Sequence, residues 1–393
     1  MRKNTVILAT LYFAYVGVYI ARLNLSMASP ELLAQGVLTS VELGFLGSAF
    51  SLIYSYGRLF NGILADRLAP KLLIAGGLLL TGLSNLLLGL LPAYLLFLVL
   101  WSFNAFGQSM LWSSILRTTT NLYSKVEADK KVTILTTSIA VGNILGILLG
   151  GQTVSWMGLR WAFLVPGILT ALTGMAVLYV MGTVRIEPPA QKREFALWSL
   201  LKNRRLLGIL PPALLHGMIK DNISLWMAVY FLDRFAVDLQ KTAWYVLLIP
   251  AVGLLGRMAY PVLYRLTGKR ENLVSLICFG CCAVLSALLL PVSVTPLWAA
   301  VCLSLLFAFV SMINTSILSI FPLRFAASNQ VASVSGLTDF ATYLGSAIGS
   351  AVYGFWIAGG HYQYMFLSWA GVSLVSILML FAQKPMRKEE NYV

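Results

Sequence analysis

The sequence predicts an all-α integral membrane protein with twelve membrane-spanning helices. Of its 393 residues 59% are hydrophobic and 11% are charged, and the mean hydropathy is +0.83. Water-soluble domains of this size are not expected to have such a composition. The apolar runs are also continuous over about 20 residues, the length of a membrane-spanning helix. The short alternating strands of a membrane β-barrel are not seen in the sequence.

Twelve apolar runs can be placed along the chain. They cover residues 5–29, 41–64, 71–91, 93–117, 132–156, 160–182, 206–232, 242–264, 272–291, 296–320, 328–357 and 362–383. The longest polar interruption follows the sixth run and contains Pro188 and Pro189 among several basic residues. We therefore expect two six-helix bundles, 1–183 and 206–393, joined by a cytoplasmic linker over 184–205.

The net charge of +14 is explained by membrane topology. Most of the 28 Lys and Arg residues lie in the segments expected on one side, whereas the other side carries only Arg160, Arg234 and Lys241. An excess of Lys and Arg marks the cytoplasmic side of a membrane protein. We predict a multi-pass protein of the cytoplasmic (inner) membrane with both termini in the cytoplasm, and no nucleic-acid partner.

Other classes of protein are disfavoured. The first apolar run is too long, and too soon followed by others, to be a cleaved signal peptide. The cysteines have no partner histidines at metal spacing, so we expect them to pack as small side chains: Cys278, Cys281, Cys282 and Cys302. No nucleophile–base pair, metal cluster or phosphate-cradling loop is evident. We expect neither enzymatic activity nor a metal or cofactor.

An arginine lies in the middle of the first apolar run. Read at 100° per residue, Arg22 shares one stripe with Tyr15, Tyr19 and Ser26. A guanidinium at that depth costs about 2.5–3.5 kcal/mol on insertion scales. Snorkelling to the membrane surface suits arginines at helix ends, which Arg22 is not. We predict that Arg22 faces the interior of the bundle and binds an anion.

Further polar side chains lie inside other apolar runs. They are Tyr54 and Arg58 in the second run, Gln108 and Trp112 in the fourth, His216, Lys220 and Asp221 in the seventh, and Asp339 and Tyr343 in the eleventh. Arg58 can alternatively pair with Asp66 near the cytoplasmic end, and His216 can equally be a packing histidine. Lys220 and Asp221 are adjacent, so their side chains are expected to point about 100° apart and need not neutralise each other.

The loop after the second run has a distinctive pattern. The run from Gly62 through Asp66 and Arg67 to Lys71 resembles the cytoplasmic-loop signature of the major facilitator superfamily. An acid and bases at a helix end can pair in one conformation and separate in the other. We predict a conformational switch at these four residues. The resemblance implies the major facilitator fold, with two pseudo-symmetric six-helix bundles.

Several motifs resemble a narrower family, the organophosphate:phosphate antiporters, which include glycerol-3-phosphate and hexose-phosphate transporters. The motifs lie on the first, second, fourth and eighth runs: Tyr15 to Pro30, Tyr54 to Arg58, Gln108 to Trp112, and the residues from Trp244 onward. The family holds its substrate phosphate between two basic residues, on the first and seventh helices. The resemblance implies that these are Arg22 and Lys220.

The sequence also departs from that family. Lys220 replaces an arginine, which keeps the charge but loses the bidentate fork of the guanidinium. The histidine of the fifth helix falls at Gly142, and paired prolines after the fourth-helix tryptophan are replaced by Ser113 and Ser114. Asp339 is an additional acid.

The resemblance implies a monomeric secondary transporter in the lipid bilayer, an antiporter that works by alternating access. Its substrate would be a small anionic, phosphorylated solute, a phosphate ester or inorganic phosphate. The expected substrate-binding residues are Arg22, Lys220, Tyr15, Tyr19, Tyr54, Arg58, Gln108, Trp112 and Tyr343.

Two alternatives remain open at this point. One is a proton-coupled carrier of a carboxylate or other weak anion, with Asp339, Asp221 or His216 carrying the proton. In that case we hypothesise that Asp339 pairs with Lys220 and that protonation releases the lysine for the anion. The other is a transporter-like sensor that binds a sugar phosphate and signals.

Overall fold

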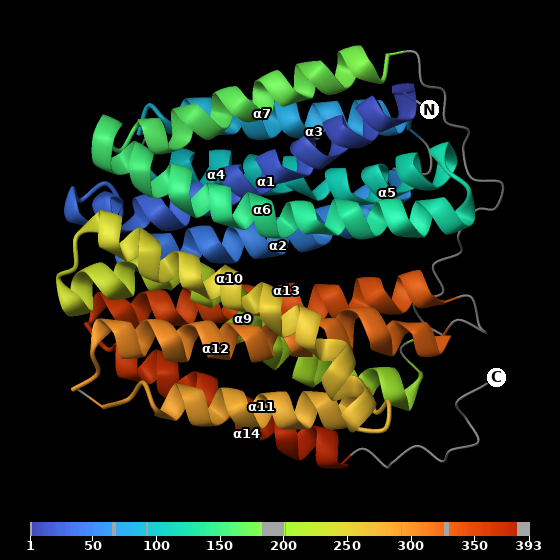
Figure 1. Ribbon diagram of the computed structural model, residues 1–393. Helices are drawn as coiled ribbons and strands as arrows, with labels where there is room; N and C mark the ends of the chain where they lie inside the picture. Colours follow the sequence, from blue (N-terminus) through green and yellow to red (C-terminus); the bar gives the residue numbers. More distant parts are fainter. Residues whose placement is uncertain are drawn as a thin grey trace. The chain divides into compact units, whose positions relative to one another are not determined.

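The computed structural model describes residues 2–64, 68–91, 93–182, 200, 202–291, 293–325 and 330–382, and these ranges are helical with no β-strand (Figure 1). The first helices are α1 Arg2–Ala34, α2 Ser40–Leu64, α3 Pro70–Leu88, α4 Tyr94–Ser109, α5 Leu111–Leu122, α6 Lys125–Met157 and α7 Trp161–Val180. The later ones are α9 Arg204–Phe235, α10 Leu239–Leu266, α11 Glu271–Ala287, α12 Pro296–Thr315, the π-helix η1 Ser316–Ile320, the 3₁₀-helix η2 Phe321–Phe325, α13 Val331–Ala358 and α14 Tyr362–Ala382.

Helices α4 and α5 follow each other directly at Met110 and form one span, Tyr94–Leu122. In the same way η1 and η2 continue α12 as far as Phe325. The described ranges therefore contain twelve helical spans, and the prediction of a twelve-helix, all-α membrane protein is confirmed. Judged by length and composition alone, eight of the described spans are long and apolar enough to cross a membrane.

Local sequence signals set the ends of several helices. The Asp238 side chain accepts a 2.8 Å hydrogen bond from the backbone N–H of Lys241, which satisfies a free donor at the start of α10. That bond holds the pKa of Asp238 below its usual value. The Thr295 hydroxyl accepts from the N–H of Trp298 in the same way at the start of α12. Helix α6 ends before Gly158, whose φ of 91° favours glycine.

The chain folds into two compact units. The first comprises residues 1–192 together with 225–247, and the second comprises 193–224 together with 248–393. The end of α9 and the start of α10 thus belong to the unit that contains α1–α7. Most of the predicted linker, residues 184–199 and 201, lies outside the described residues, and the division into bundles of 1–183 and 206–393 stays a prediction.

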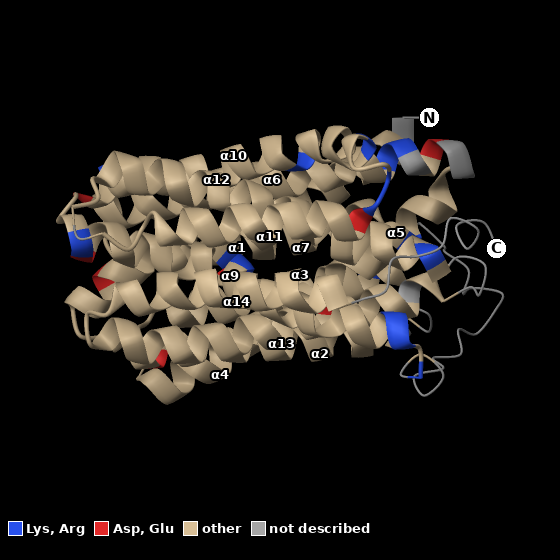
Figure 2. Ribbon diagram, turned by 90° about the horizontal axis from the view of Figure 1, so that it is seen from below, with Lys and Arg blue, Asp and Glu red and all other residues tan. Residues whose placement is uncertain are grey.

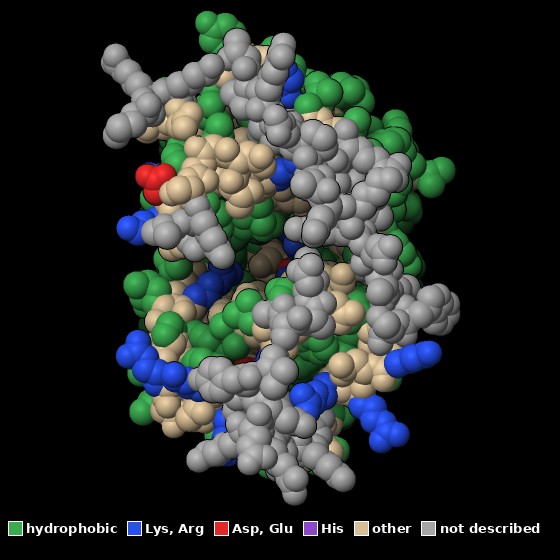
Figure 3. Space-filling model, turned by 90° about the vertical axis from the view of Figure 1, so that its right-hand side faces the viewer, with side chains coloured by type: hydrophobic (Ala, Val, Ile, Leu, Met, Phe, Trp, Pro, Cys, Tyr) green, Lys and Arg blue, Asp and Glu red, His purple; other side chains and the backbone are tan. Residues whose placement is uncertain are grey.

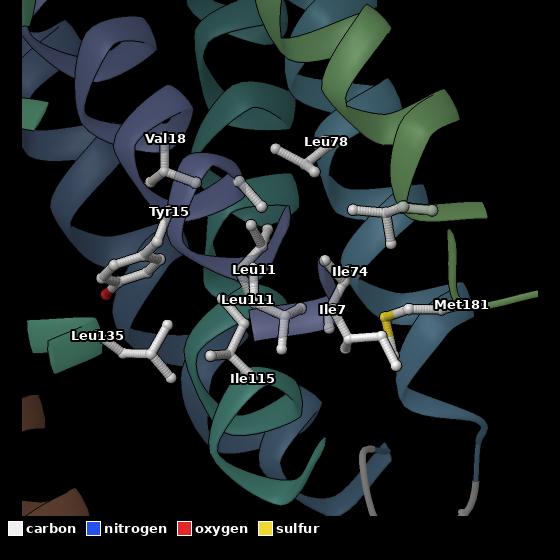
Figure 4. Close-up of a cluster of buried hydrophobic side chains, with 13 residues drawn as sticks. Ile7, Leu11, Tyr15, Val18, Ile74, Leu78, Leu111, Ile115, Leu135 and Met181 are labelled. Carbon is white, nitrogen blue, oxygen red and sulfur yellow. The ribbon is translucent and has the colours of Figure 1, made fainter. Parts of the chain in front are cut away.

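The first unit is built around α1 and α3. Helix α1 packs against α6 and α7, and α3 packs against α4 and α7. Glycines allow these close approaches: a Cβ at Gly82 would lie 2.9 Å from the backbone oxygen of Gly167, and one at Gly142 would lie 2.6 Å from Cβ of Tyr19. A cluster of buried aliphatic side chains fills the space between α1, α3 and α5 (Figure 4). It includes Ile7, Leu11, Ile74, Leu78, Leu111 and Ile115.

In the second unit α11 packs against α12 and α14, and α9 packs against α13. The α9–α13 approach is so close that the backbone of the partner helix leaves no space for a Cβ at Gly217 or Gly345. The carboxylate of Glu271, at the start of α11, is 2% exposed and forms an ion pair with Arg324 of η2. The Ser316 hydroxyl donates a 2.8 Å hydrogen bond to the backbone oxygen of Glu271, which ties η1 to the same helix start.

Charged residues are concentrated at the ends of the helices. In Figure 2 the middle stretches of the ribbons are almost entirely uncharged, apart from a few positions. Figure 3 looks onto one end, where many Lys and Arg side chains and few acidic ones are visible among the coloured atoms. The few charges within the described helices are therefore candidates for function.

Candidate functional site

Arg22 lies in the middle of α1 and is surrounded by aromatic rings. Its guanidinium carbon lies 4.5 Å from the ring centroid of Tyr54, 5.0 Å from that of Tyr19 and 5.1 Å from that of Phe50. All three distances are within the range of cation–π attraction. The aromatic faces of α1 and α2 thus stabilise a charge that the membrane would otherwise disfavour.

The guanidinium is also held at one edge by α4. Nε of Arg22 donates a 3.0 Å hydrogen bond to Oε1 of Gln108, whose side chain is 1% exposed. The amide nitrogen of Gln108 donates to the backbone oxygen of Ala21 and to the side chain of Asn104. Because its N–H groups are engaged elsewhere, Gln108 presents its carbonyl oxygen to Arg22.

The remaining aromatic residues of the predicted site in this unit are linked, through Tyr15, to the rings around Arg22. Tyr15 lies edge-on to Tyr19, with ring centroids 5.5 Å apart, and its centroid is 4.8 Å from that of Trp112. Tyr15 is 5% exposed, and its hydroxyl points away from the neighbouring aliphatic side chains (Figure 4). Arg58 lies with its guanidinium carbon 5.9 Å from the ring of Tyr54. The structure therefore brings all seven site residues predicted in the first unit into one continuous set of contacts.

The second unit carries its own cation. The ammonium of Lys220 lies 4.7 Å from the ring centroid of Tyr343 of α13, so the two predicted residues of this unit also meet. Lys220 forms a 3.3 Å ion pair with Asp221, and the two side chains are 17% and 37% exposed. The sequence analysis expects that these neighbours need not neutralise each other; in the structure they do pair. The long lysine stem bends round to the adjacent carboxylate.

The other two candidates for proton coupling lie on the same two helices as Lys220 and Tyr343. Asp339 lies on α13, one turn before Tyr343. His216 is fully buried one turn before Lys220 on α9, the environment expected of a packing histidine. Asp221 is the carboxylate whose ion pair with Lys220 is described above. The roles of Asp339 and His216 stay predictions.

Two buried asparagines near the cations are not among the site residues predicted from the sequence. Asn24 follows Arg22 by two positions, and Asn222 follows Lys220 by two positions. Both are fully buried, and both bond to other helices. Asn222 donates to the backbone oxygen of Ser346 at 3.2 Å and accepts from another serine of α13 at 2.9 Å. The repeated cation-x-Asn spacing is the signal that could have found them.

The predicted switch loop is only partly described. Gly62 lies in the last turn of α2, whereas Asp66 and Arg67 fall outside the described residues. Lys71 lies in the first turn of α3, and its ammonium donates a 2.9 Å hydrogen bond to the backbone oxygen of Gly182. The switch itself stays a prediction.

Two sequence expectations about small residues have a structural explanation. The position of the family histidine is occupied by Gly142, where Cβ of Tyr19 and the backbone of Val16 leave no room for a side chain. The cysteines pack in the interior of the second unit, and Sγ of Cys278 lies 3.8 Å from Sδ of Met312. Their predicted packing role is confirmed for Cys278, Cys282 and Cys302, which are buried.

Long apolar helices and charged residues enclosed by aromatic side chains in mid-membrane are features of a membrane transport protein. Residues 11–350 match the Major Facilitator Superfamily, and the chain belongs to this family. The fold agrees: the crystal structure of the nucleoside transporter NupG superposes with a TM-score of 0.79 over 96% of this chain and 100% of that chain, at 13% identity.

Curated relatives match shorter segments. A probable hexose phosphate transport protein of Chlamydia muridarum is 31% identical over 169 residues, 43% of this chain and 37% of the relative. The membrane sensor protein UhpC of Salmonella typhimurium is 31% identical over 44% of this chain and 39% of the relative. The glycerol-3-phosphate transporter of Haemophilus influenzae is 26% identical over 61% of this chain and 58% of the relative. The matched segments span less than two thirds of each of these relatives.

Proposed function

We propose that this protein is a secondary transporter that exchanges a small phosphorylated organic anion for inorganic phosphate by alternating access. The observation that carries the proposal is the setting of Arg22: a guanidinium in the middle of a membrane helix, bound at one edge and flanked by three aromatic rings. A planar donor held in this way suits the oxygens of a phosphate. The phosphorylated solutes named for two of the relatives support the same class of substrate.

In this proposal Arg22 in the first unit and Lys220 in the second unit are both anion-binding residues. Arg22 binds phosphate oxygens with its fork of N–H groups, whereas Lys220 acts as a compact point charge. Tyr15, Tyr19 and Tyr54 supply hydroxyl groups and aromatic walls around the first cation. Because Lys220 is already paired with Asp221, an arriving anion competes with that carboxylate. Binding through the second unit is therefore sensitive to the charge of Asp221.

Transport is tested by reconstitution. Purified protein in liposomes loaded with phosphate should take up labelled glucose 6-phosphate or glycerol 3-phosphate, and liposomes without internal phosphate should not. The Arg22→Ala protein is the matched control and should insert without transporting. Uptake that follows an imposed pH gradient, with no need for internal phosphate, would contradict exchange and favour the proton-coupled alternative.

A second candidate function is sensing, because UhpC, a membrane sensor protein, is among the similar relatives. A sensor would bind a sugar phosphate through the same residues without moving it across the membrane. Binding of glucose 6-phosphate to the purified protein, combined with no uptake or counterflow in liposomes, would favour the sensor over the transporter.

The proposal includes the location and orientation of the chain. We place it in the cytoplasmic membrane as a monomer, with both termini on the cytoplasmic side, on the strength of the one-sided distribution of Lys and Arg. Accessibility of introduced cysteines to impermeant reagents tests this orientation directly.

A further inference from the structure

A chain of buried amide side chains runs through the first unit and ends at Arg22. It consists of Asn24 on α1, Asn85 on α3, and Asn104 and Gln108 on α4. The three asparagines are fully buried and Gln108 is 1% exposed. Burying an amide side chain in a membrane protein costs free energy unless the amide is hydrogen-bonded. Four such side chains grouped together therefore suggest a specific role.

The end of the chain farthest from Arg22 is anchored to backbone. The side-chain nitrogen of Asn24 donates to Oδ1 of Asn85 at 2.8 Å and to the backbone oxygen of Ala162 of α7 at 3.1 Å. The side-chain nitrogen of Asn85 donates to the backbone oxygen of Thr81 at 2.9 Å and to Oδ1 of Asn104 at 3.3 Å. Four helices, α1, α3, α4 and α7, are thereby tied together through the side chains of Asn24 and Asn85.

The near end fixes the turn of α1 that carries the arginine. Asn104 donates to the backbone oxygen of Ala21 at 3.2 Å, and Gln108 donates to the same oxygen at 3.3 Å and to Oδ1 of Asn104 at 3.0 Å. Ala21 immediately precedes Arg22. Because the N–H groups of Gln108 are occupied, its remaining oxygen accepts the hydrogen bond from Nε of Arg22.

We propose that Asn24, Asn85 and Asn104 are positioning residues, which act through Gln108 to hold the guanidinium of Arg22 in one orientation for phosphate. This inference rests on the proposed role of Arg22 in binding the substrate anion. In a medium of low polarity a fully bonded amide network is rigid, because turning any one amide would leave buried groups without partners. Gln108 accordingly acts through Arg22 and not by touching the substrate.

The arrangement is suited to arginine and not to lysine. In lysine a methylene group occupies the place of Nε, so Gln108 would lose its donor. The second unit shows the contrast: Asn222 also follows a cation by two positions, yet it bonds to α13, and the head of Lys220 contacts Asp221 and Tyr343. The amide chain therefore serves the guanidinium in particular.

The test measures the affinity of the purified full-length protein for inorganic phosphate and glucose 6-phosphate by calorimetry. Asn85→Leu removes the middle of the chain at similar volume. We expect both affinities to fall about tenfold, the effect of one N–H···O bond to phosphate lost when the guanidinium is no longer held in one orientation. The matched control is Asn61→Leu. Asn61 is 1% exposed on α2, bonds to Ser109 at 2.8 Å and lies outside the chain of amides. This control should lower thermal stability and leave affinity within about twofold of wild type.

A double-mutant cycle separates positioning from general destabilisation. In an Arg22→Lys background Asn85→Leu should have no further effect on affinity, since the bond it supports is already absent. An equal loss in both backgrounds would show that Asn85 acts through stability alone and would overturn the proposal.

A milder variant keeps the test decisive if Asn85→Leu does not fold. Asn24→Ala removes only the far anchor and should weaken affinity in the same direction by a smaller factor. If Arg22→Ala abolishes binding while Asn24→Ala and Asn85→Leu bind as tightly as wild type, the amide chain is not a positioning device and the proposed function stands. If Arg22→Ala itself binds normally, the proposed function fails.

Discussion

The substitution Arg22→Lys tests the central feature of the proposed site. The charge is kept, but the guanidinium with its five N–H donors is replaced by a single ammonium group. The 3.0 Å bond from Nε to Gln108 is lost, while part of the cation–π attraction from Tyr19, Phe50 and Tyr54 remains available to the ammonium.

The size of the effect follows from comparing the empty and loaded protein. The bond to Gln108 exists in both states, so its direct energy largely cancels in the affinity. What differs is the number of N–H···O bonds to phosphate, and one charge-assisted bond contributes about 1.5–3 kcal/mol. We therefore expect binding to weaken roughly 10- to 150-fold. Leaving Oε1 of Gln108 buried without its donor should also lower stability by about 1–3 kcal/mol.

Calorimetric titration of phosphate into purified wild-type, Arg22→Lys and Arg22→Ala proteins gives the affinities, and liposome exchange gives the rates. Arg22→Ala should abolish both, while size-exclusion profiles stay those of the wild type. Arg22→Lys with wild-type affinity would show that the fork of the guanidinium is not used. Normal binding and exchange by Arg22→Ala would show that Arg22 is structural.

The remaining predictions concern orientation, packing and protons. A cysteine introduced beside Lys130 should react with impermeant reagents from the cytoplasmic side, and one beside Arg234 from outside; the reverse pattern would overturn the topology. Gly142→His should lower the melting temperature measurably, because a Cβ there would lie 2.6 Å from the nearest side chain of α1, and an unchanged melting temperature would contradict this packing. Asp221→Asn should raise anion affinity several-fold at neutral pH and flatten its pH dependence by removing the competing carboxylate. If only Asp339→Asn flattens the pH dependence of anion affinity, the titrating group is Asp339 of α13 and not Asp221.

Helical periodicity accounts for what the sequence could predict of the site. The stripe of Tyr15, Tyr19 and Arg22 is a property of one helix at 100° per residue, and the structure confirms that the three lie in contact. Tyr54 and Arg58 are one turn apart on α2 and also meet. The twelve apolar runs of the sequence correspond to the twelve helical spans, since each helix must satisfy its own backbone within the membrane.

The sequence does not predict which side chains of different helices are in contact. Nothing in the order of residues shows that Asn85, 61 positions after Asn24, accepts its hydrogen bond, because this depends on how α3 crosses α1. The pairing of Lys220 with Asp221 was missed for another reason. Periodicity fixes the direction of Cβ, whereas a lysine stem has four further rotatable bonds and can reach a neighbouring carboxylate.

The two cations are supported by different means, and this difference bears on the choice between exchange and proton coupling in the proposed function. Arg22 is bonded to a neutral amide, which cannot be protonated and so holds the guanidinium equally at any physiological pH. Lys220 is bonded to a carboxylate, which competes with a bound anion and is relieved by a proton or by the anion itself. Beyond the titration of the phosphate ligand itself, whose second pKa is about 6 for an ester, any dependence of affinity on pH should therefore enter through the second unit. An exchanger and a proton-coupled carrier can therefore share the same first unit and differ only in the strength of the ion pair between Asp221 and Lys220.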